Sequence, residues 1–179
     1  AQPAPGQHTG YEYSRSGNPT RHALETAIAD LENGTRGYAF ASGLAAISAV
    51  LELLDKDSHL VAVDDVYGGT YRLLENVRRR SAGLQVSWVK PDDLAGIEAA
   101  IRPDTRMIWV ETPTNPLLKL ADLSAISAIA RRHNLISVAD NTFASPAIHR
   151  PLEHGFDIVV HSATKYLNGH SDVVAGLAV

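Results

Sequence analysis

The sequence predicts an α/β protein with three layers, in which helices cover both faces of a mostly parallel sheet. Two features of the pattern carry this prediction. Short, nearly continuous apolar runs alternate along the chain with amphipathic segments of helical period. Strands that are apolar on both faces are typical of parallel sheets buried between helices. No run approaches the roughly 20 apolar residues that a membrane span requires.

The first elements are predicted to be an arm and two helices. Prolines and glycines cluster in the first ten residues, which indicates a loop-like start. A helix is expected over residues 19–33, with Asn18 as its N-cap, Pro19 at its first position and Gly34 closing it. A second, largely apolar helix is expected after Ser42-Gly43, and its apolarity indicates burial on several sides.

From residue 59 onward, strands and helices are expected to alternate. The predicted strands cover residues 59–63, 84–89, 107–110, 135–139 and 158–161, with a last apolar run over 173–179. The predicted helices cover residues 70–80, 93–101 and 123–133. This alternation favours crossover connections between parallel strands.

Composition excludes several classes of function. The formal net charge of −4 argues against a nucleic-acid partner, which requires a basic surface. The chain has no cysteine, so disulfides, thiolate nucleophiles and cysteine-ligated metals are excluded. The first ten residues lack the pattern of a signal peptide. We therefore expect a cytoplasmic protein with neither a nucleic-acid nor a membrane partner.

Polar residues follow four of the predicted strands at the point where each strand ends. These segments are 64–69, 111–116, 140–142 and 161–165. Ligands of open α/β sheets bind at the carboxyl ends of the strands, so four such ends together predict a site. The plainer interpretation is that Asp, Asn, Thr and Gly merely terminate strands.

Lys165 is the most informative candidate at these strand ends. It lies between hydroxyl and aromatic residues in Ser162-Ala163-Thr164-Lys165-Tyr166. Burial disfavours the charged form of an amine, and a neutral amine can attack a carbonyl to form a Schiff base. The alternative is an ordinary surface lysine in a loop.

Asp140 ends an otherwise largely nonpolar strand, and a buried carboxylate there needs a cationic partner. A protonated pyridine nitrogen is one candidate, because a carboxylate strengthens such a ring as an electron sink. The alternative is an aspartate whose oxygens accept hydrogen bonds from backbone amides in a turn.

Ser42-Gly43-Leu44 opens a helix, where free amides and the helix dipole favour a phosphate group. The hydroxyls of Ser162 and Thr164 could bind the same phosphate. The alternative for Ser42 is a simple N-cap, which does not require a ligand.

Three further residues are candidates for cofactor contacts. The ring of Tyr67 could lie flat on a planar cofactor, although a core or turn tyrosine is the plainer interpretation. Tyr13 and Arg15 lie on the arm and suit an oxyanion such as phosphate, although they could simply be solvated. Other signatures are absent from the sequence: glycine-rich dinucleotide and Walker motifs, a nucleophile elbow, and a histidine pair with metal-binding spacing.

Together these segments resemble the Cys/Met-metabolism family of enzymes that depend on pyridoxal 5′-phosphate (PLP), the trans-sulfuration enzymes. The matching segments occur in family order, and their combination is far more specific than any one of them. They are YEYSRSGNPTR at 11–21, ASGLAA at 41–46, DDVYGGTYR at 64–72, ETPTNP at 111–116, VADNTFASP at 138–146 and SATKYLNGHSDVV at 162–174.

The resemblance implies a role for each matched residue. Lys165 looks like the Schiff-base and proton-transfer lysine, Asp140 like the partner of the ring nitrogen, and Tyr67 like the stacking tyrosine and a catalytic acid/base. The phosphate-binding residues would be Gly43, Leu44, Ser162 and Thr164. The full set of implied cofactor-binding residues is Tyr13, Arg15, Gly43, Leu44, Tyr67, Asn115, Asp140, Thr142, Ser162, Thr164 and Lys165. No metal is implied.

The resemblance also implies a homo-oligomer and a longer protein. Residues 1–20 would form an arm whose Tyr13 and Arg15 complete the site of a neighbouring subunit, in a dimer of dimers. Residues 21–179 would form most of the PLP-binding large domain. Family members are about twice as long, so the C-terminal domain, with the arginine that binds the substrate carboxylate, would lie outside this sequence.

The implied substrate is a sulfur-containing amino acid. The segments favour γ-elimination of L-cystathionine to cysteine, 2-oxobutanoate and ammonia. Cystathionine γ-synthesis from an O-acyl-homoserine and cysteine, cystathionine β-elimination and methionine γ-elimination are alternatives. Two readings from other classes stay open: a dinucleotide-binding oxidoreductase and a non-catalytic nucleotide-binding module.

Overall fold

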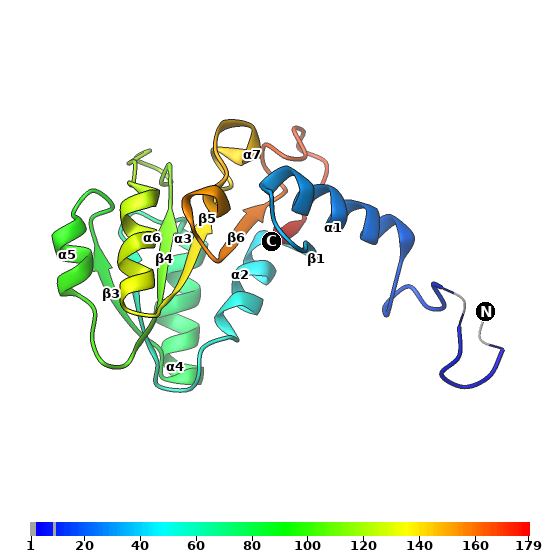
Figure 1. Ribbon diagram of the computed structural model, residues 1–179, viewed down its shortest axis with the longest axis horizontal. Helices are drawn as coiled ribbons and strands as arrows, with labels where there is room; N and C mark the ends of the chain where they lie inside the picture. The colour runs from blue at the N-terminus through cyan, green and yellow to red at the C-terminus, as the bar shows by residue number, and fades with distance from the viewer. Residues whose placement is uncertain (1–2, 9) are drawn as a thin grey trace.

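The computed structural model describes residues 3–8 and 10–179. Its centre is a seven-stranded sheet with the spatial order β1–β7–β6–β5–β4–β2–β3 (Figure 1). The strands are β1 (Tyr38–Phe40), β2 (His59–Val63), β3 (Gln85–Val89), β4 (Thr105–Glu111), β5 (Ile136–Asp140), β6 (Ile158–Ser162) and β7 (Gly176–Ala178). The strands β3, β2, β4, β5 and β6 are parallel, while β7 is antiparallel to both β6 and β1. The predicted mostly parallel sheet is therefore confirmed.

Helices cover both faces of this sheet. On one face lie α5 (Leu94–Ala99) and α6 (Leu123–Arg132), and on the other lie α2 (Gly43–Leu51) and a longer helix over residues 68–82 (Figure 1). That longer helix is joined to α2 by a hydrogen bond from Arg78 to Ser48 Oγ, 2.8 Å long. Side chains such as Leu60, Met107 and Trp109 are fully buried between the layers. None of the helices among the described residues is both long and apolar enough to span a bilayer.

The helix starts follow the predicted caps. Helix α1 (Pro19–Glu32) begins after Asn18, whose side-chain oxygen accepts from the amides of Thr20 and Arg21. Ser42 Oγ accepts from the amide of Ala45 at the start of α2. Helix α1 ends one residue before the predicted end, because Asn33 takes the left-handed conformation, with φ 61°, and caps the helix in place of Gly34.

Other boundaries differ from the prediction because the segments are short or irregular. The expected helix over 70–80 starts earlier and ends later, as α3 (Gly68–Arg72), the π-helical η1 (Leu73–Arg78) and α4 (Arg79–Ala82). In the apolar run 173–179 only β7 is a strand. Strand β1, α7 (Ser145–Ile148) and the 3-10 helix η2 (Pro151–His154) were not predicted, because three or four residues show no periodicity.

The N-terminal segment extends away from the body of the molecule, together with the first turns of α1 (Figure 1). Residues 1, 2 and 9 of the predicted arm lie outside the described residues. Tyr11 and Tyr13 are exposed, at 50% and 57%. Tyr11 lies near His22, with 6.3 Å between ring centroids, yet the rings of Tyr11 and Tyr13 both remain about half exposed.

Candidate active site

A cavity of about 210 Å³ opens at the carboxyl ends of β4, β5 and β6, beside the start of α2. Parallel strands bring their carboxyl ends to one edge of the sheet, so residues distant in sequence meet there. Nine of the eleven predicted site residues line this cavity: Gly43, Leu44, Tyr67, Asn115, Asp140, Thr142, Ser162, Thr164 and Lys165. The two exceptions are on the arm.

Lys165 lies in the turn that follows β6. Its amide donates to Ser162 O over 3.1 Å, and its carbonyl accepts from Gly169 N over 3.0 Å. The side chain lines the cavity and is exposed, so it combines the two interpretations of the sequence, a pocket residue and an exposed lysine in a loop. In the described part of the chain, no carboxylate lies within ion-pair distance of its amine.

Asp140 ends β5 and is only 7% exposed. Its Oδ1 accepts from Thr142 N over 3.0 Å and from Thr142 Oγ1 over 2.5 Å. Burial raises the pKa of Asp140, and these two hydrogen bonds offset part of that effect. No Lys or Arg of the described chain pairs with this carboxylate, so a ligand that brings positive charge would stabilise it.

Glu111 lies beside Asp140 on the neighbouring strand, because the parallel pairing of β4 and β5 sets the two residues opposite each other. It is 5% exposed and lines the same cavity. Burial, and then the charge of Asp140, raise the pKa of Glu111 to about 8. The sequence placed Glu111 at a strand end without assigning it a role, because strand pairing cannot be read from one sequence.

The wall of the cavity at α2 is formed where Gly43 packs closely against Ser162. A Cβ added to Gly43 would lie 2.7 Å from Ser162 Cβ, so only glycine lets α2 approach β6 this closely. The amides of Gly43 and Leu44 are at the helix start, where no intrahelical acceptor exists. Ser42 Oγ acts as the N-cap, which is the plainer of the two interpretations of that residue.

The two hydroxyl residues near this wall differ in their contacts. Thr164 Oγ1 donates to Ala175 O and accepts from Ala175 N, over 3.2 and 3.1 Å. A phosphate would have to compete with Ala175 for that hydroxyl. The amide of Ser162 donates to Thr142 Oγ1 over 2.8 Å, which joins the end of β6 to the Asp140 turn.

The remaining predicted residues divide between the cavity and the arm. Tyr67 lines the cavity and is 46% exposed, and Asn115 lines it from the loop after β4. Tyr13 and Arg15 contact each other, with the guanidinium carbon 5.1 Å from the ring centroid. They do not line the cavity of their own chain and lie on the segment that points away from it (Figure 1).

Several apolar residues of the cavity were not predicted, among them Phe143 and Val174. Phe143 follows the Asp140 turn and packs edge-on against Tyr166, with 5.8 Å between ring centroids. Val174 lines the cavity from the segment before β7. Both residues lie in segments that match the family pattern. Their position in these segments was the only sign in the sequence that they line the site.

Comparison with known proteins identifies the class to which this fold and pocket belong. The structure superposes with a TM-score of 0.96 on a cystathionine gamma-lyase from Lactobacillus plantarum, crystallised with L-serine. The two share 52% sequence identity, over 100% of this chain and 46% of that one. The fold is thus that of PLP-dependent enzymes of fold type I.

The chain belongs to the Cys/Met metabolism PLP-dependent enzyme family, whose model matches residues 1–179. It is 61% identical to a cystathionine beta-lyase of Coxiella burnetii, over 100% of this chain and 46% of that protein. It is 54% identical to a cystathionine gamma-lyase of Bacillus subtilis, over 99% of this chain and 47% of that protein. The chain therefore spans about half the length of these relatives.

The residues of the cavity fit the family's cofactor. A buried carboxylate without a cation suits a protonated ring nitrogen, and the Gly43 wall with its helix amides suits a phosphate. Lys165 lines the same cavity as these two features. The carboxylate and the helix amides are thus complementary to the two charged ends of PLP, the ring nitrogen and the phosphate.

Proposed function

We propose that this chain is the cofactor-binding part of a trans-sulfuration enzyme that cleaves L-cystathionine by γ-elimination. The observation that carries the proposal is the buried Asp140 in a cavity that also holds Lys165 and the Gly43 wall. A carboxylate in that position destabilises an empty pocket and stabilises one that holds a cation. The cytoplasm is the proposed location.

Each residue has a defined task in this proposal. Asp140 holds the ring nitrogen in its protonated form, and Tyr67 covers one side of the ring. The amides of Gly43 and Leu44 hold the phosphate, together with Ser162 and Thr164. Bound PLP supplies the electron sink that stabilises negative charge at the α-carbon of the substrate.

Lys165 moves the proton. Its free amine would remove the proton from the α-carbon of the substrate. Its exposed position in the cavity gives the amine room to reach both the cofactor and the substrate. In γ-elimination a second proton leaves the β-carbon and the γ-thiol departs, so that cystathionine and water yield cysteine, 2-oxobutanoate and ammonia.

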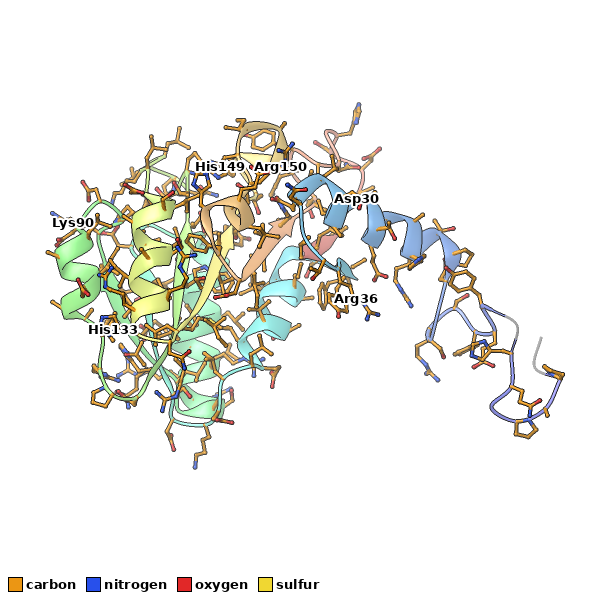
Figure 2. The ribbon with its side chains drawn as sticks, in the orientation of Figure 1. Asp30, Arg36, Lys90, His133, His149 and Arg150 are labelled. Carbon is orange, nitrogen blue, oxygen red and sulfur yellow. The ribbon has the colours of Figure 1, made fainter. Side chains whose placement is uncertain are left out.

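The attachment of the cofactor is tested with the full-length protein and its absorbance spectrum. We expect a yellow protein in which borohydride fixes the cofactor to Lys165, as located by mass spectrometry. Lys165→Ala should lose the yellow band. Lys90→Ala is the matched control, because Lys90 is an exposed lysine at the far side of the molecule near α5 (Figure 2). A colourless protein that PLP does not reconstitute would contradict the proposal.

The reaction is tested by its products. We expect L-cystathionine to give cysteine and 2-oxobutanoate. Homocysteine and pyruvate would instead identify β-elimination, which is the activity named for the Coxiella burnetii relative. Formation of cystathionine from an O-acyl-homoserine and cysteine would identify the synthase reaction.

A further inference from the structure

Glu111 is a buried acid in the cavity for which the proposed function has no task. Paired positions on parallel strands present their side chains on the same face, so Glu111 and Asp140 share the floor of the cavity. Both are almost fully buried. A buried carboxylate costs free energy unless it is paired or protonated, so a second one beside Asp140 requires an explanation.

The contacts of Glu111 give the first part of that explanation. Its Oε2 accepts from Tyr67 N and its Oε1 from Asn115 N, each over 2.9 Å. Tyr67 follows β2 and starts α3, whereas Asn115 belongs to the loop after β4. One carboxyl group therefore fixes two separate segments, and each segment carries a predicted cofactor contact.

The charges around Glu111 give the second part. Asp140 faces it from β5, and Asp65 lies on the segment after β2. Tyr67, His161 and Lys165 line the same cavity. Within the described residues, no Lys, Arg or His lies within ion-pair distance of Glu111. Two adjacent buried carboxyl groups without a cation cannot both ionise readily, so one of them keeps a proton.

We propose that Glu111 is a positioning residue, which holds Tyr67 and Asn115 at the floor of the cavity and shares one proton with Asp140. The positioning part stands on the geometry of this chain alone. Its consequence for PLP affinity rests on the proposed function. The raised pKa of Glu111, at about 8, agrees with a proton that Glu111 and Asp140 share.

Two substitutions of Glu111 separate the effect of its side-chain length from the effect of its charge. Glu111→Asp keeps the acid but shortens the side chain, so it cannot reach both amides. Glu111→Gln keeps the length but removes the charge and one of the two acceptors. Glu75→Gln is the matched control, because Glu75 also accepts two hydrogen bonds, from Trp88 Nε1 and Arg79, outside the cavity.

Positioning is measured by hydrogen exchange on the cofactor-free protein. In Glu111→Asp we expect the amides of Tyr67 and Asn115 to exchange roughly tenfold faster, and in Glu111→Gln at least one of them. Glu75→Gln should exchange like the wild type at both amides. Unchanged exchange in both Glu111 variants would overturn the positioning role.

The shared proton is measured by carbon NMR of labelled glutamate carboxyl groups on the same cofactor-free protein. The signal lost in Glu111→Gln should titrate far above the other glutamates, and Asp140→Asn should lower its midpoint. A signal with an ordinary midpoint, or one that ignores Asp140→Asn, would overturn the sharing.

The PLP affinity of the variants is the last readout. We expect roughly tenfold weaker binding in Glu111→Asp, and unchanged binding in Glu75→Gln. Unchanged binding in Glu111→Asp, despite faster exchange, would remove the link to the cofactor. If the wild type bound no PLP, the proposed function would fail, while the exchange and titration results would still decide the role of Glu111.

Discussion

Asp140 is a buried carboxylate that accepts two hydrogen bonds from Thr142, and no Lys or Arg of the described chain pairs with it. Its raised pKa, which is caused by burial, means that folding costs more free energy when the carboxylate is ionised. The residue therefore lowers the stability of the cofactor-free protein at neutral pH and gains its benefit only from a ligand. Function and stability oppose each other at this one position.

The substitution Asp140→Asn tests that opposition. It removes the buried charge, so the cofactor-free protein should unfold at a higher denaturant concentration at pH 7. It also removes a charge-assisted hydrogen bond of about 1.5–3 kcal/mol, so PLP should bind roughly 10- to 100-fold more weakly. Chemical unfolding and spectroscopic titration measure the two effects. A variant that is less stable and binds PLP normally would contradict the assignment.

Glu111 makes the stability of the cofactor-free protein depend on pH. Its pKa is about 8 in the folded state and near 4.5 otherwise, so between these values the folded state holds more protons than the unfolded state. The free energy of unfolding should therefore fall as the pH rises from about 5 to 8. Glu111→Gln should flatten this slope, as measured by urea unfolding at a series of pH values. An equally steep slope in the variant would mean that Glu111 does not cause the pH dependence.

Helix α1 is held to the sheet by a buried polar cluster at its last turn. Glu32 Oε1 lies 2.6 Å from His161 Nε2, and both side chains are fully buried. Asn141 Nδ2 donates to the same oxygen and to His149 O. His161 also lines the cavity, so the cluster connects the last turn of α1 to the site.

A further bond at the end of α1 lies nearer the surface. Arg150 Nε donates to Leu31 O over 2.7 Å. Figure 2 shows Arg150 and His149 beside the end of α1 that carries Asp30. The helix from which the arm extends is thus anchored to the segments that follow β5.

The substitution Glu32→Ala should destabilise the protein by about 3–5 kcal/mol, because it leaves buried His161 and Asn141 without their shared acceptor. Glu153→Ala is the matched control: Glu153 is exposed and pairs with Arg150 and Asn33, so its loss should cost less than about 1 kcal/mol. Denaturant unfolding measures both. Equal effects of the two substitutions would mean that the buried cluster does not anchor α1.

The elements show which features a single sequence can predict. Asn18 and Ser42 were predicted as caps because a cap needs only a local side chain and the next few amides. The strand-end residues of the cavity were predicted because the carboxyl ends of parallel strands meet at one edge of the sheet. Strand β1 and the opposition of Glu111 and Asp140 were not predicted, since both depend on which distant strands pair.

The predicted site residues lie in two separate parts of the molecule. Those at the strand ends meet in one cavity, whereas Tyr13 and Arg15 lie on an arm that leaves the body (Figure 1). Arg15 keeps its guanidinium over the exposed ring of Tyr13. This placement supports the proposal that the arm serves the site of a neighbouring subunit.

Mixed oligomers test the arm. Arg15→Ala and Lys165→Ala proteins should each be nearly inactive alone. After the two are unfolded and refolded together, random pairing should restore about a quarter of the wild-type activity, because each mixed dimer has one site without a substitution. No recovery, with mixed dimers detected by mass spectrometry, would place both residues in the site of a single chain.

The antiparallel pairing of β1 with β7 has a kinetic consequence. It joins Tyr38 to Ala178, two residues far apart in the sequence, and contacts between such distant segments slow folding. The same edge brings Gly176 against Ser42 and Gly43, the residues that shape the wall of the cavity. The wall of the cavity is therefore complete only when this edge is closed, so we expect PLP to bind weakly to a chain in which β1 and β7 are still apart.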